Sequence, residues 1–365
     1  MTSPAVVVLS AIDPVLRGVA AGDLLCDLPG ALVVQHDLLP AGLRRVVYGS
    51  DGVREDVLVP LEHACLSCAL REDVLPTVRR TLAGGGAAPA VVLALPATAE
   101  PLPVVQALVR ARVRVGPLVT VLDGASVVDD LLGDDLLSER GIGLTVDDAR
   151  SVGEALAHQL ELADVVLLPG PAPAQATAVL EHLAPEGARH VALHSGGLAG
   201  ATLVEDARTR RARREELLRR GDPRCLGSRS TDDRAGVWTL DLRSWRPFHP
   251  ARLLEEIEAL GAGPMRGRGC FWLPTRPDVV VAWDGAGGQL SIGGVGSWGS
   301  PAYPGHVAER ETRLLVTGVD HDPAVLRRAF DSALMTDAEL ATGLDRWAGR
   351  PDGFDAWLGP LEEVA

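Results

Sequence analysis

Short runs of apolar residues alternate with helical segments through the first two hundred positions. Most of these runs are apolar at successive positions and rich in Val, Ile or Leu; they lie at residues 5–9, 31–34, 90–95, 118–122, 164–168 and 190–193. An unbroken apolar run of this length suits a strand that helices cover on both faces. The pattern therefore predicts an α/β domain with a mostly parallel sheet and helices on both of its faces.

The pattern changes after residue 200. A charged segment at residues 201–235 reads as a helix end and a linker. It precedes apolar runs typical of strands at residues 237–242, 269–273, 279–283, 290–293 and 312–319, and helical segments at 250–260 and 323–333. We expect four parts: an α/β domain over 1–200, the linker, a smaller α+β domain over 236–345, and a C-terminal tail over 346–365.

Composition and charge narrow the functional classes. The chain has 365 residues, of which 47% are hydrophobic, and this suffices for two ordinary domain cores. Its five cysteines are too few and too scattered for a disulfide framework, and no run approaches the length that spans a bilayer. A cytoplasmic protein without membrane contact is expected. The net charge of −14 disfavours nucleic-acid binding, except at the arginine-rich run between Arg208 and Arg220, which could contact RNA.

Several short segments carry a resemblance to a known family. Residues 65–73 read Cys-Leu-Ser-Cys-Ala-Leu-Arg-Glu-Asp, which is similar to the Cys-x-Cys-Cys-x-Leu-Arg-x-Asp segment of the CobW-like metal-associated GTPases. Asp123 and the stretch 159–164 resemble further segments of that family. The second half resembles the CobW C-terminal domain at residues 246–250, 269–273, 275–278, 283–288 and 334–337. The resemblance implies a P-loop-like fold in the first domain.

The phosphate-binding loop of such a domain is degenerate here. Triphosphate binding needs a glycine-rich turn, a lysine, and a Ser or Thr hydroxyl for magnesium. The loop expected from Ser10 to Gly18 contains no Gly-Lys-Ser/Thr. Pro14 lacks an N–H group, and Asp13 would place negative charge beside a phosphate. Arg17 is the one cation that could still meet an anion.

Two other nucleotide motifs are also missing. Pro-Ala at residues 96–97 stands where the family has Thr-Gly, and Pro-Gly-Pro-Ala at residues 169–172 stands where it has Asn-Lys-x-Asp. Three elements of one function are thus lost together. We expect that the chain neither requires nor hydrolyses GTP.

The cysteine pair is the best remaining candidate site. Thiolates at positions i and i+3 can ligate one zinc ion, which prefers sulfur and nitrogen donors in a tetrahedron. The candidates are Cys65 and Cys68, with His63 and His36 as further ligands and Asp37 and Glu62 as weaker ones. Ser67 replaces the family's middle cysteine, so a sulfur is lost.

Other interpretations of these residues remain open. The two cysteines can be small buried side chains or a redox dithiol, although the flanks of a thioredoxin-like motif are absent. His249, directly before Pro250, is expected to cap or pack against a helix rather than bind metal. The tryptophans of the second domain are expected to be core, or to line a cleft or partner surface.

These features predict a zinc-binding pseudo-GTPase that acts as a metal-responsive regulatory or recruitment factor with a protein partner. The composition, rich in Ala, Arg and Gly and poor in Lys, suggests a high-GC actinobacterial source. The Cys-x-x-Cys form resembles an actinobacterial branch of the family linked to zinc-responsive ribosome hibernation, in which the protein recruits a hibernation factor to the ribosome. The alternative is a metallochaperone that uses GTP to insert zinc or cobalt into a client protein.

Overall fold

The computed structural model describes residues 5–63, 65–84, 90–145, 147–194, 213–227, 233–300, 307–320 and 322–361. They divide into two compact units. The first comprises Met1–Asp130 and Asp135–Leu218, and the second comprises Leu131–Asp134 and Arg219–Ala365. Within the described ranges, no helix has the length and apolar character needed to cross a membrane.

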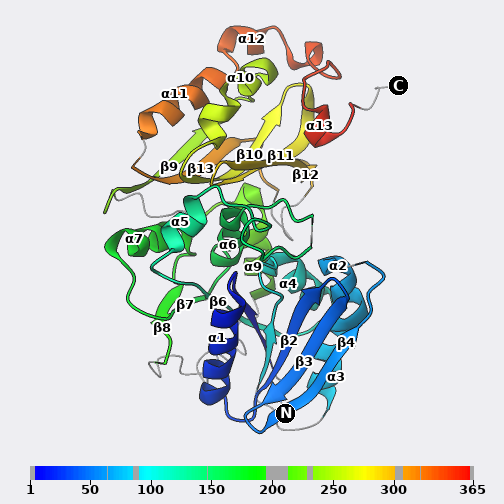
Figure 1. Cartoon of the computed structure of the whole chain (residues 1–365). Helices are drawn as coiled ribbons and strands as arrows, with labels where there is room; N and C mark the ends of the chain where they lie inside the picture. The colour runs from blue at the N-terminus through cyan, green and yellow to red at the C-terminus, as the bar shows by residue number, and fades with distance from the viewer. Residues whose placement is uncertain are drawn as a thin grey trace. The chain divides into compact units, whose positions relative to one another are not determined.

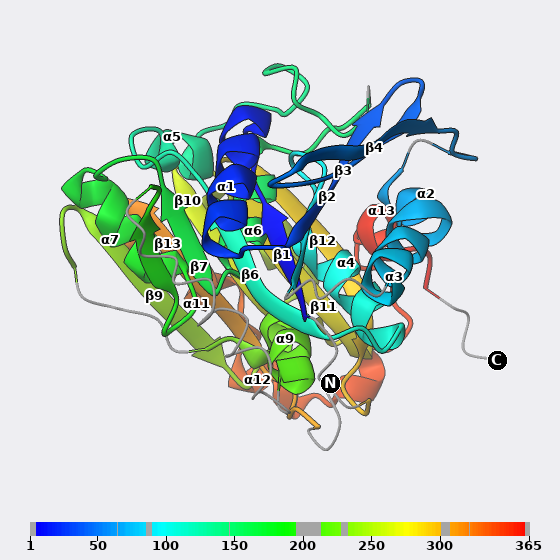
Figure 2. The same ribbon diagram turned by 90° about the horizontal axis from the view of Figure 1, so that it is seen from below.

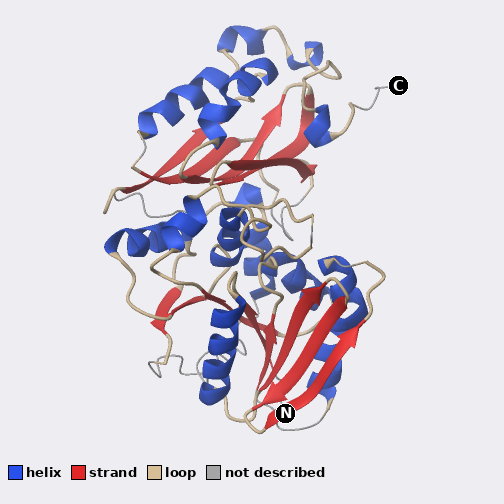
Figure 3. Cartoon of the chain, in the orientation of Figure 1, coloured by secondary structure: helices blue, strands red, loops and turns tan. Residues whose placement is uncertain are grey.

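An eight-stranded sheet forms the centre of the first unit (Figures 1 and 3). Its order is β4-β3-β2-β5-β1-β6-β7-β8, and all neighbours from β2 to β8 pair in parallel. The strands are β1 (Ala5–Ser10), β2 (Leu32–Leu39), β3 (Gly42–Gly49), β4 (Gly52–Val59), β5 (Ala90–Ala94), β6 (Val115–Val121), β7 (Val165–Leu168) and β8 (Arg189–Ala192). The predicted α/β class is confirmed, and all six predicted strands are present.

Helices cover both faces of this sheet. The chain forms α1 (Pro14–Asp27), α2 (Leu66–Ala69), a π-helical turn (Leu70–Val74), α3 (Leu75–Ala83), α4 (Pro101–Arg110), α5 (Val127–Leu132), α6 (Val152–Leu160), α7 (Ala174–Leu183) and α9 (Arg213–Gly221). Apolar side chains of α1 pack with Val7 and Leu9 of β1 on one face. Those of α3 and α4 pack with Val6 and Val8 on the other, and in Figure 2 α1 and α4 lie on opposite sides of β1. Alternate residues of one strand thus serve two cores, because successive side chains point to opposite faces.

The antiparallel hairpin β3–β4 was not predicted. Its strands mix charged with apolar residues, which makes them unlike the unbroken runs of the parallel strands, and Ser50-Asp51 forms the two-residue turn before Gly52. Gly52 has φ of +121°, a backbone conformation that glycine adopts without strain. The hairpin places β4 at the sheet edge, where Val53 and Leu58 are 66% and 53% exposed.

The second unit is a five-stranded antiparallel sheet with the order β12-β11-β10-β13-β9. Its elements are β9 (Val237–Ser244), α10 (Pro250–Gly261), β10 (Met265–Leu273), β11 (Arg276–Ala286), β12 (Gln289–Ser297), β13 (Thr312–Val319), α11 (Pro323–Ala333), α12 (Asp337–Ala341) and α13 (Asp355–Leu358), with short 3₁₀ turns at Pro223–Cys225 and Leu344–Arg346. The helices α10 and α11 contact one another and pack on one face of the sheet (Figure 1). The predicted smaller α+β domain is confirmed.

The segment expected to be a tail from residue 346 onward packs on this unit instead. Phe354 is fully buried within its apolar core. The carboxylate of Asp352 accepts hydrogen bonds from Thr275 and from Arg276 Nε, each of 2.8 Å. These contacts fix residues 352–354 against the start of β11.

The aromatic and histidine residues of the second unit have structural positions. Trp238, Trp272, Trp283 and Trp298 are buried, whereas Trp245 is 65% exposed. The His249 imidazole caps α10 by accepting a hydrogen bond from the Arg252 N–H, at 3.4 Å. The predicted capping role of His249 is therefore confirmed.

A charge cluster joins β9 to β13 in the second unit. Arg313 donates two hydrogen bonds to the Asp241 carboxylate, of 2.9 and 2.8 Å, and a third to the Leu226 carbonyl. Arg243 lies directly opposite Arg313 across the strands and also donates to Asp241. Burial alone would raise the pKa of Asp241, but the hydrogen bonds from Arg313 and Arg243 outweigh it and lower the pKa to about 2.

We predict that Asp241→Asn destabilises the second unit at neutral pH by about 2 kcal/mol, the size expected for this pKa shift. Because the pKa in the folded state lies below the ordinary 3.8, the stabilisation is present above that value and is lost as the pH falls toward 2. Denaturant unfolding between pH 7 and pH 2 measures the difference, which should shrink with acidification. Asp278→Asn, which alters a 78% exposed carboxylate paired with Arg310, is the matched control.

Candidate functional site

The loop after β1 is occupied by a side chain of the protein itself. The helix α1 begins at Pro14, so the expected loop from Ser10 to Gly18 is shortened to three residues, and Gly18 lies within the helix. Asp13 caps the helix, and its Oδ1 accepts hydrogen bonds from the N–H groups of Val15 (2.6 Å) and Leu16 (3.2 Å). A helix N-terminus offers such N–H groups to an anion. Here the Asp13 carboxylate is that anion.

Arg17 points into the protein rather than toward this loop. Its side chain is 2% exposed and donates to the carbonyl oxygens of Leu95 (2.6 Å) and His36 (3.3 Å). It also forms an ion pair with Asp37 on β2. The expectation that Arg17 could meet an anion as a free charge is therefore wrong, because a carboxylate already neutralises it inside the fold. The whole chain contains no lysine that could replace it.

The adjacent loop after β5 is fixed by hydrogen bonds within the unit. The Thr98 N–H donates to the Ala11 carbonyl at 2.9 Å, and Gln159 Nε2 donates to the carbonyls of Ala11 and Ala99. Thr98 is fully buried with φ of +64°, which is strained for a residue other than glycine. Ser10 Oγ faces Thr120 Oγ1 at 3.0 Å and is also buried. The Thr98 amide and the Ser10 hydroxyl are thus engaged internally.

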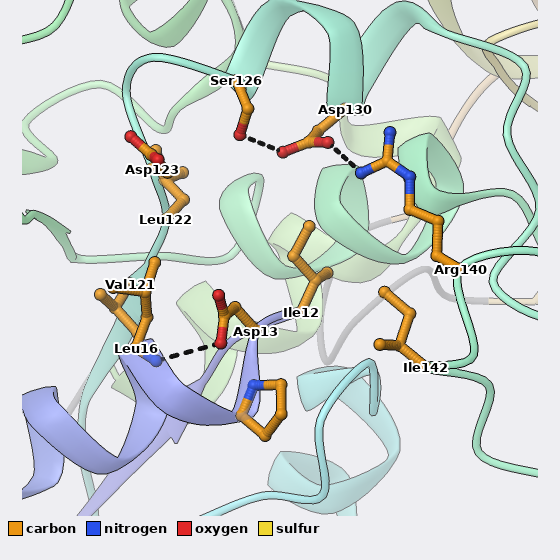
Figure 4. Close-up of a pocket in the computed structure, with 11 residues that line it drawn as sticks. Ile12, Asp13, Leu16, Val121, Leu122, Asp123, Ser126, Asp130, Arg140 and Ile142 are labelled. Carbon is orange, nitrogen blue, oxygen red and sulfur yellow. Dashed lines mark hydrogen bonds and ion pairs between the residues drawn. The ribbon is translucent and has the colours of Figure 1, made fainter.

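A pocket of about 360 Å³ opens at the carboxyl ends of β1 and β6, the edge at which α/β sheets bind ligands (Figure 4). Its walls are apolar apart from Ser126 and four charged residues: Asp13, Asp123, Asp130 and Arg140. Arg140 forms ion pairs with Asp130 and Asp135, and Ser126 donates to Asp130. The lining therefore carries excess negative charge, which repels phosphate groups.

The cysteine segment, residues 62–74, lies between β4 and α3. Cys65 caps α2, and its sulfur accepts the Cys68 N–H at 3.4 Å. The Cys68 sulfur lies 3.9 Å from His63 Nδ1 and 3.9 Å from the guanidinium of Arg71. Arg71 is held in turn by Glu62 and Glu72. Cys68 thus contacts both Cys65 and His63.

The two thiols differ in acidity. The hydrogen bond from the Cys68 N–H lowers the pKa of the Cys65 thiol. The hydrogen bond between the two side chains raises the pKa of Cys68, because Cys68 keeps the shared proton. Cys65 is therefore the more acidic of the two thiols, which suits either a metal ligand or a reactive thiol. The redox interpretation of the pair remains open on this geometry.

His36 has a different role from the one expected. It is fully buried, and its Nε2 lies 2.8 Å from Asp73 Oδ1 at the end of the cysteine segment. Arg45 of β3 pairs with the second oxygen of Asp73, and Thr77 donates to the first. Burial alone would raise the pKa of Asp73, but its bond with His36 and the charge of Arg45 lower it. Sequence reasoning missed Asp73, whose sole signal was its place in the family segment.

One pair of the candidate donors has a spacing that suits zinc. In a tetrahedral site a sulfur and a nitrogen lie about 3.5 Å apart, close to the spacing of Cys68 Sγ and His63 Nδ1. In the described part of the chain, no three ligand atoms from His36, His63, Cys65 and Cys68 lie within 4.8 Å of one another, so the structure shows pairs of neighbouring donors rather than an assembled site. The assignment of these residues as zinc ligands stays a prediction, with His63 placed at the sulfurs and His36 placed on Asp73.

The arginine-rich run is described only in part. Residues 208–212 lie outside the described ranges, and α9 begins at Arg213. Arg213 is 6% exposed and pairs with Asp164 and Glu216 within the first unit. This arginine is therefore structural, because a buried and paired cation does not present itself to RNA.

Two domain families match the chain. Residues 44–196 match the CobW/HypB/UreG nucleotide-binding domain, and residues 237–334 match the cobalamin synthesis protein cobW C-terminal domain. The matches follow the same order along the chain as the two units.

Three known proteins illustrate the similarity. "Zinc chaperone Rv0106" of Mycobacterium tuberculosis is 29% identical over 90% of this chain and 87% of its own length. "Zinc-regulated GTPase metalloprotein activator 1" of Dictyostelium discoideum is 21% identical over 84% of this chain and 70% of its own length. The Zn(II)-bound YjiA GTPase from E. coli aligns with 92% of this chain and 100% of its own, at 14% identity and a TM-score of 0.36.

We predict that Cys65→Ala combined with Cys68→Ala removes the zinc bound at the cysteine segment and leaves the fold intact, because it deletes both sulfur donors but little buried volume. Metal analysis of purified protein measures zinc, and circular dichroism checks the fold. The matched control is Cys26→Ala with Cys225→Ala, which removes two thiols outside the cysteine segment. Equal zinc content in the two double variants would contradict the site.

Proposed function

Because this chain belongs to the CobW family, with both of its domains, we propose that it is a zinc-binding pseudo-GTPase that regulates or recruits a partner in response to metal. Relatives named zinc chaperone and zinc-regulated GTPase support the metal-associated part of this proposal. The pseudo-GTPase part rests on the loop after β1.

One observation supports the proposed loss of nucleotide turnover. Asp13 accepts hydrogen bonds from the helix N–H groups that a phosphate would need. A triphosphate entering this loop would have to displace the carboxylate from Val15 and Leu16 while meeting its negative charge. Arg17 does not offset that repulsion, because it is buried against Asp37, and Arg140 in the pocket lining is already paired with Asp130 and Asp135. The helix N–H groups and the arginine next to this loop thus make internal contacts, which supports the proposed loss of phosphate binding.

Zinc in this proposal is held by Cys65, Cys68 and His63. When bound, the ion supplies a fixed positive charge and a coordination link between the loop before α2 and the helix itself. Cys65 contributes the more acidic thiol, and Arg71 places positive charge beside the Cys68 sulfur. Three ligands leave a fourth position for water or for a partner side chain, as in exchangeable zinc sites.

The cysteine segment is connected to the sheet in a way that suits a metal-controlled surface. The π-helical turn at Leu70–Val74 follows the cysteines directly, and Asp73 anchors it to His36 and Arg45. Such turns are frequent at functional sites. Occupancy by zinc would fix the cysteine end of a segment whose other end is already anchored. We infer that this ordered segment is read by a partner protein.

The partner we propose is a ribosome-hibernation factor or the ribosome itself. The support is the Cys-x-x-Cys form of the segment and its resemblance to that actinobacterial branch. RNA contact through the run between Arg208 and Arg220 would use the arginines other than Arg213. The proposal places the protein in the cytoplasm, because the proposed role requires access to both zinc and ribosomes.

A GTP-dependent metallochaperone is the second candidate. The pocket of about 360 Å³ beside Asp13 and the names of the relatives favour it. Its acidic lining argues against it, because a nucleotide would bring further negative charge. Calorimetry separates the two candidates.

We predict that titration of the full chain with GTP and magnesium gives no binding heat and no phosphate release. Asp13→Gly frees the two N–H groups but leaves Arg17 buried, so this variant should also fail to hydrolyse GTP. Micromolar GTP binding with phosphate release by the wild type would establish the metallochaperone alternative.

We also predict that zinc controls partner recovery. Cys65→Ala with Cys68→Ala should change the amount of partner recovered in a pull-down from an actinobacterial lysate several-fold, corresponding to about 1 kcal/mol of coupling or more. A chelator titration of the wild type should reproduce the effect, and the Cys26→Ala, Cys225→Ala control should not. Recovery that is unchanged across the chelator titration would end the metal-switch proposal.

A further inference from the structure

We propose a second divalent-metal site in the first unit, formed by Glu100, Glu154 and His158. One ligand atom from each of these residues lies within 4.8 Å of the other two, and all three side chains are partly buried. Glu100 Oε1 lies 3.5 Å from His158 Nδ1. The site is separate from the cysteine segment and contains no sulfur.

Two helices position the three ligands. Glu154 and His158 are four residues apart on α6, so they lie on the same face of that helix, one turn apart. Glu100 is the N-cap residue of α4, and α4 contacts α6. Ser151 caps α6 by accepting the Glu154 N–H at 2.9 Å, which fixes the first turn of the helix. Ligands on helices and caps are held more rigidly than ligands on loops.

The charge of the surroundings favours a divalent cation. Arg150 is the basic neighbour, but it makes two hydrogen bonds with Asp148, of 2.9 and 2.8 Å, and one with Glu100, of 3.1 Å. Glu100, Glu154, Asp148 and Arg150 together carry a net charge of −2. One divalent ion bound by the two carboxylates and a neutral imidazole brings this group to neutrality.

The ligand types select the class of metal. Imidazole nitrogen suits zinc, cobalt and their neighbours, whereas magnesium and calcium require mainly oxygen donors. Three protein ligands leave one coordination position open in a tetrahedron, which gives exchange rather than permanent structure. A sulfur-free site binds zinc less tightly than a thiolate site. The first unit would then contain two metal sites, one with thiolate ligands and one with only carboxylate and imidazole ligands.

Cobalt(II) alone is the probe that tests this site in the full chain. Thiolate ligation gives Co²⁺ an intense near-ultraviolet charge-transfer band, which a site with only nitrogen and oxygen donors lacks. We expect the Cys65→Ala, Cys68→Ala variant to keep one equivalent of Co²⁺ without that band. Adding Glu154→Gln and His158→Gln should weaken the remaining binding at least tenfold. Adding Glu181→Gln, an exposed glutamate on α7, should not.

Two further measurements keep the test decisive. Paramagnetically shifted imidazole signals in the Co²⁺-loaded Cys65→Ala, Cys68→Ala variant should disappear on His158→Gln, independently of any change in stability. Co²⁺ affinity that is equal with and without Glu154→Gln and His158→Gln would overturn the second site. A wild type that lacks the charge-transfer band would instead count against the cysteine site alone, so the two proposals fail separately.

Discussion

The buried guanidinium of Arg17 links the parts of the first unit on which its chemistry depends. Arg17 belongs to the first turns of α1, the helix that Asp13 caps. Its guanidinium reaches the end of β5, where it donates to the Leu95 carbonyl. It also binds β2, through the His36 carbonyl and the Asp37 carboxylate. The imidazole of the same His36 holds Asp73 of the cysteine segment. A connected set of hydrogen bonds therefore runs from α1 through β2 to the cysteine segment, and the charge of Arg17 at its centre is neutralised by Asp37.

This arrangement illustrates how an acidic chain without lysine uses its cations. Arg17, Arg266, Arg276 and Arg313 are buried, and each binds a carboxylate together with at least one other acceptor. The planar guanidinium carries several donors, so one side chain can satisfy backbone carbonyls and a carboxylate together, which a lysine cannot do as well. Burial makes these pairs expensive to break, because removing one partner leaves the other charge unsatisfied. The buried pairs fix the elements they join relative to one another within each unit, whereas exposed ion pairs contribute little to the stability of the fold.

Much of the fold was predictable from the apolar pattern, because parallel strands buried on both faces leave unbroken apolar runs. The hairpin β3–β4 was missed because Arg44, Arg45, Glu55 and Asp56 interrupt its apolar residues. The Asp-Gly dipeptide at the end of its turn was a signal for it. The degenerate loop was recognisable from its residue types, and the proximity of His63 to the cysteines follows from short sequence spacing. The partners of Arg17 and His36 were not predictable, since they lie 20 and 37 residues away and meet only when strands and helices pack. The cluster on α4 and α6 depends on tertiary contact in the same way.

The Asp13 cap also bears on how such a protein changes through evolution. A sequence change that restored a glycine-rich loop would first remove a helix cap, which typically costs about 1 kcal/mol. A lysine in place of Arg17 would lack the planar fork that donates to Asp37 and to two carbonyl oxygens together. Each single step toward a working phosphate loop therefore loses stability before any nucleotide affinity is gained. A phosphate-binding sequence at this loop therefore requires several substitutions at once, because each change made alone breaks contacts that stabilise the first unit.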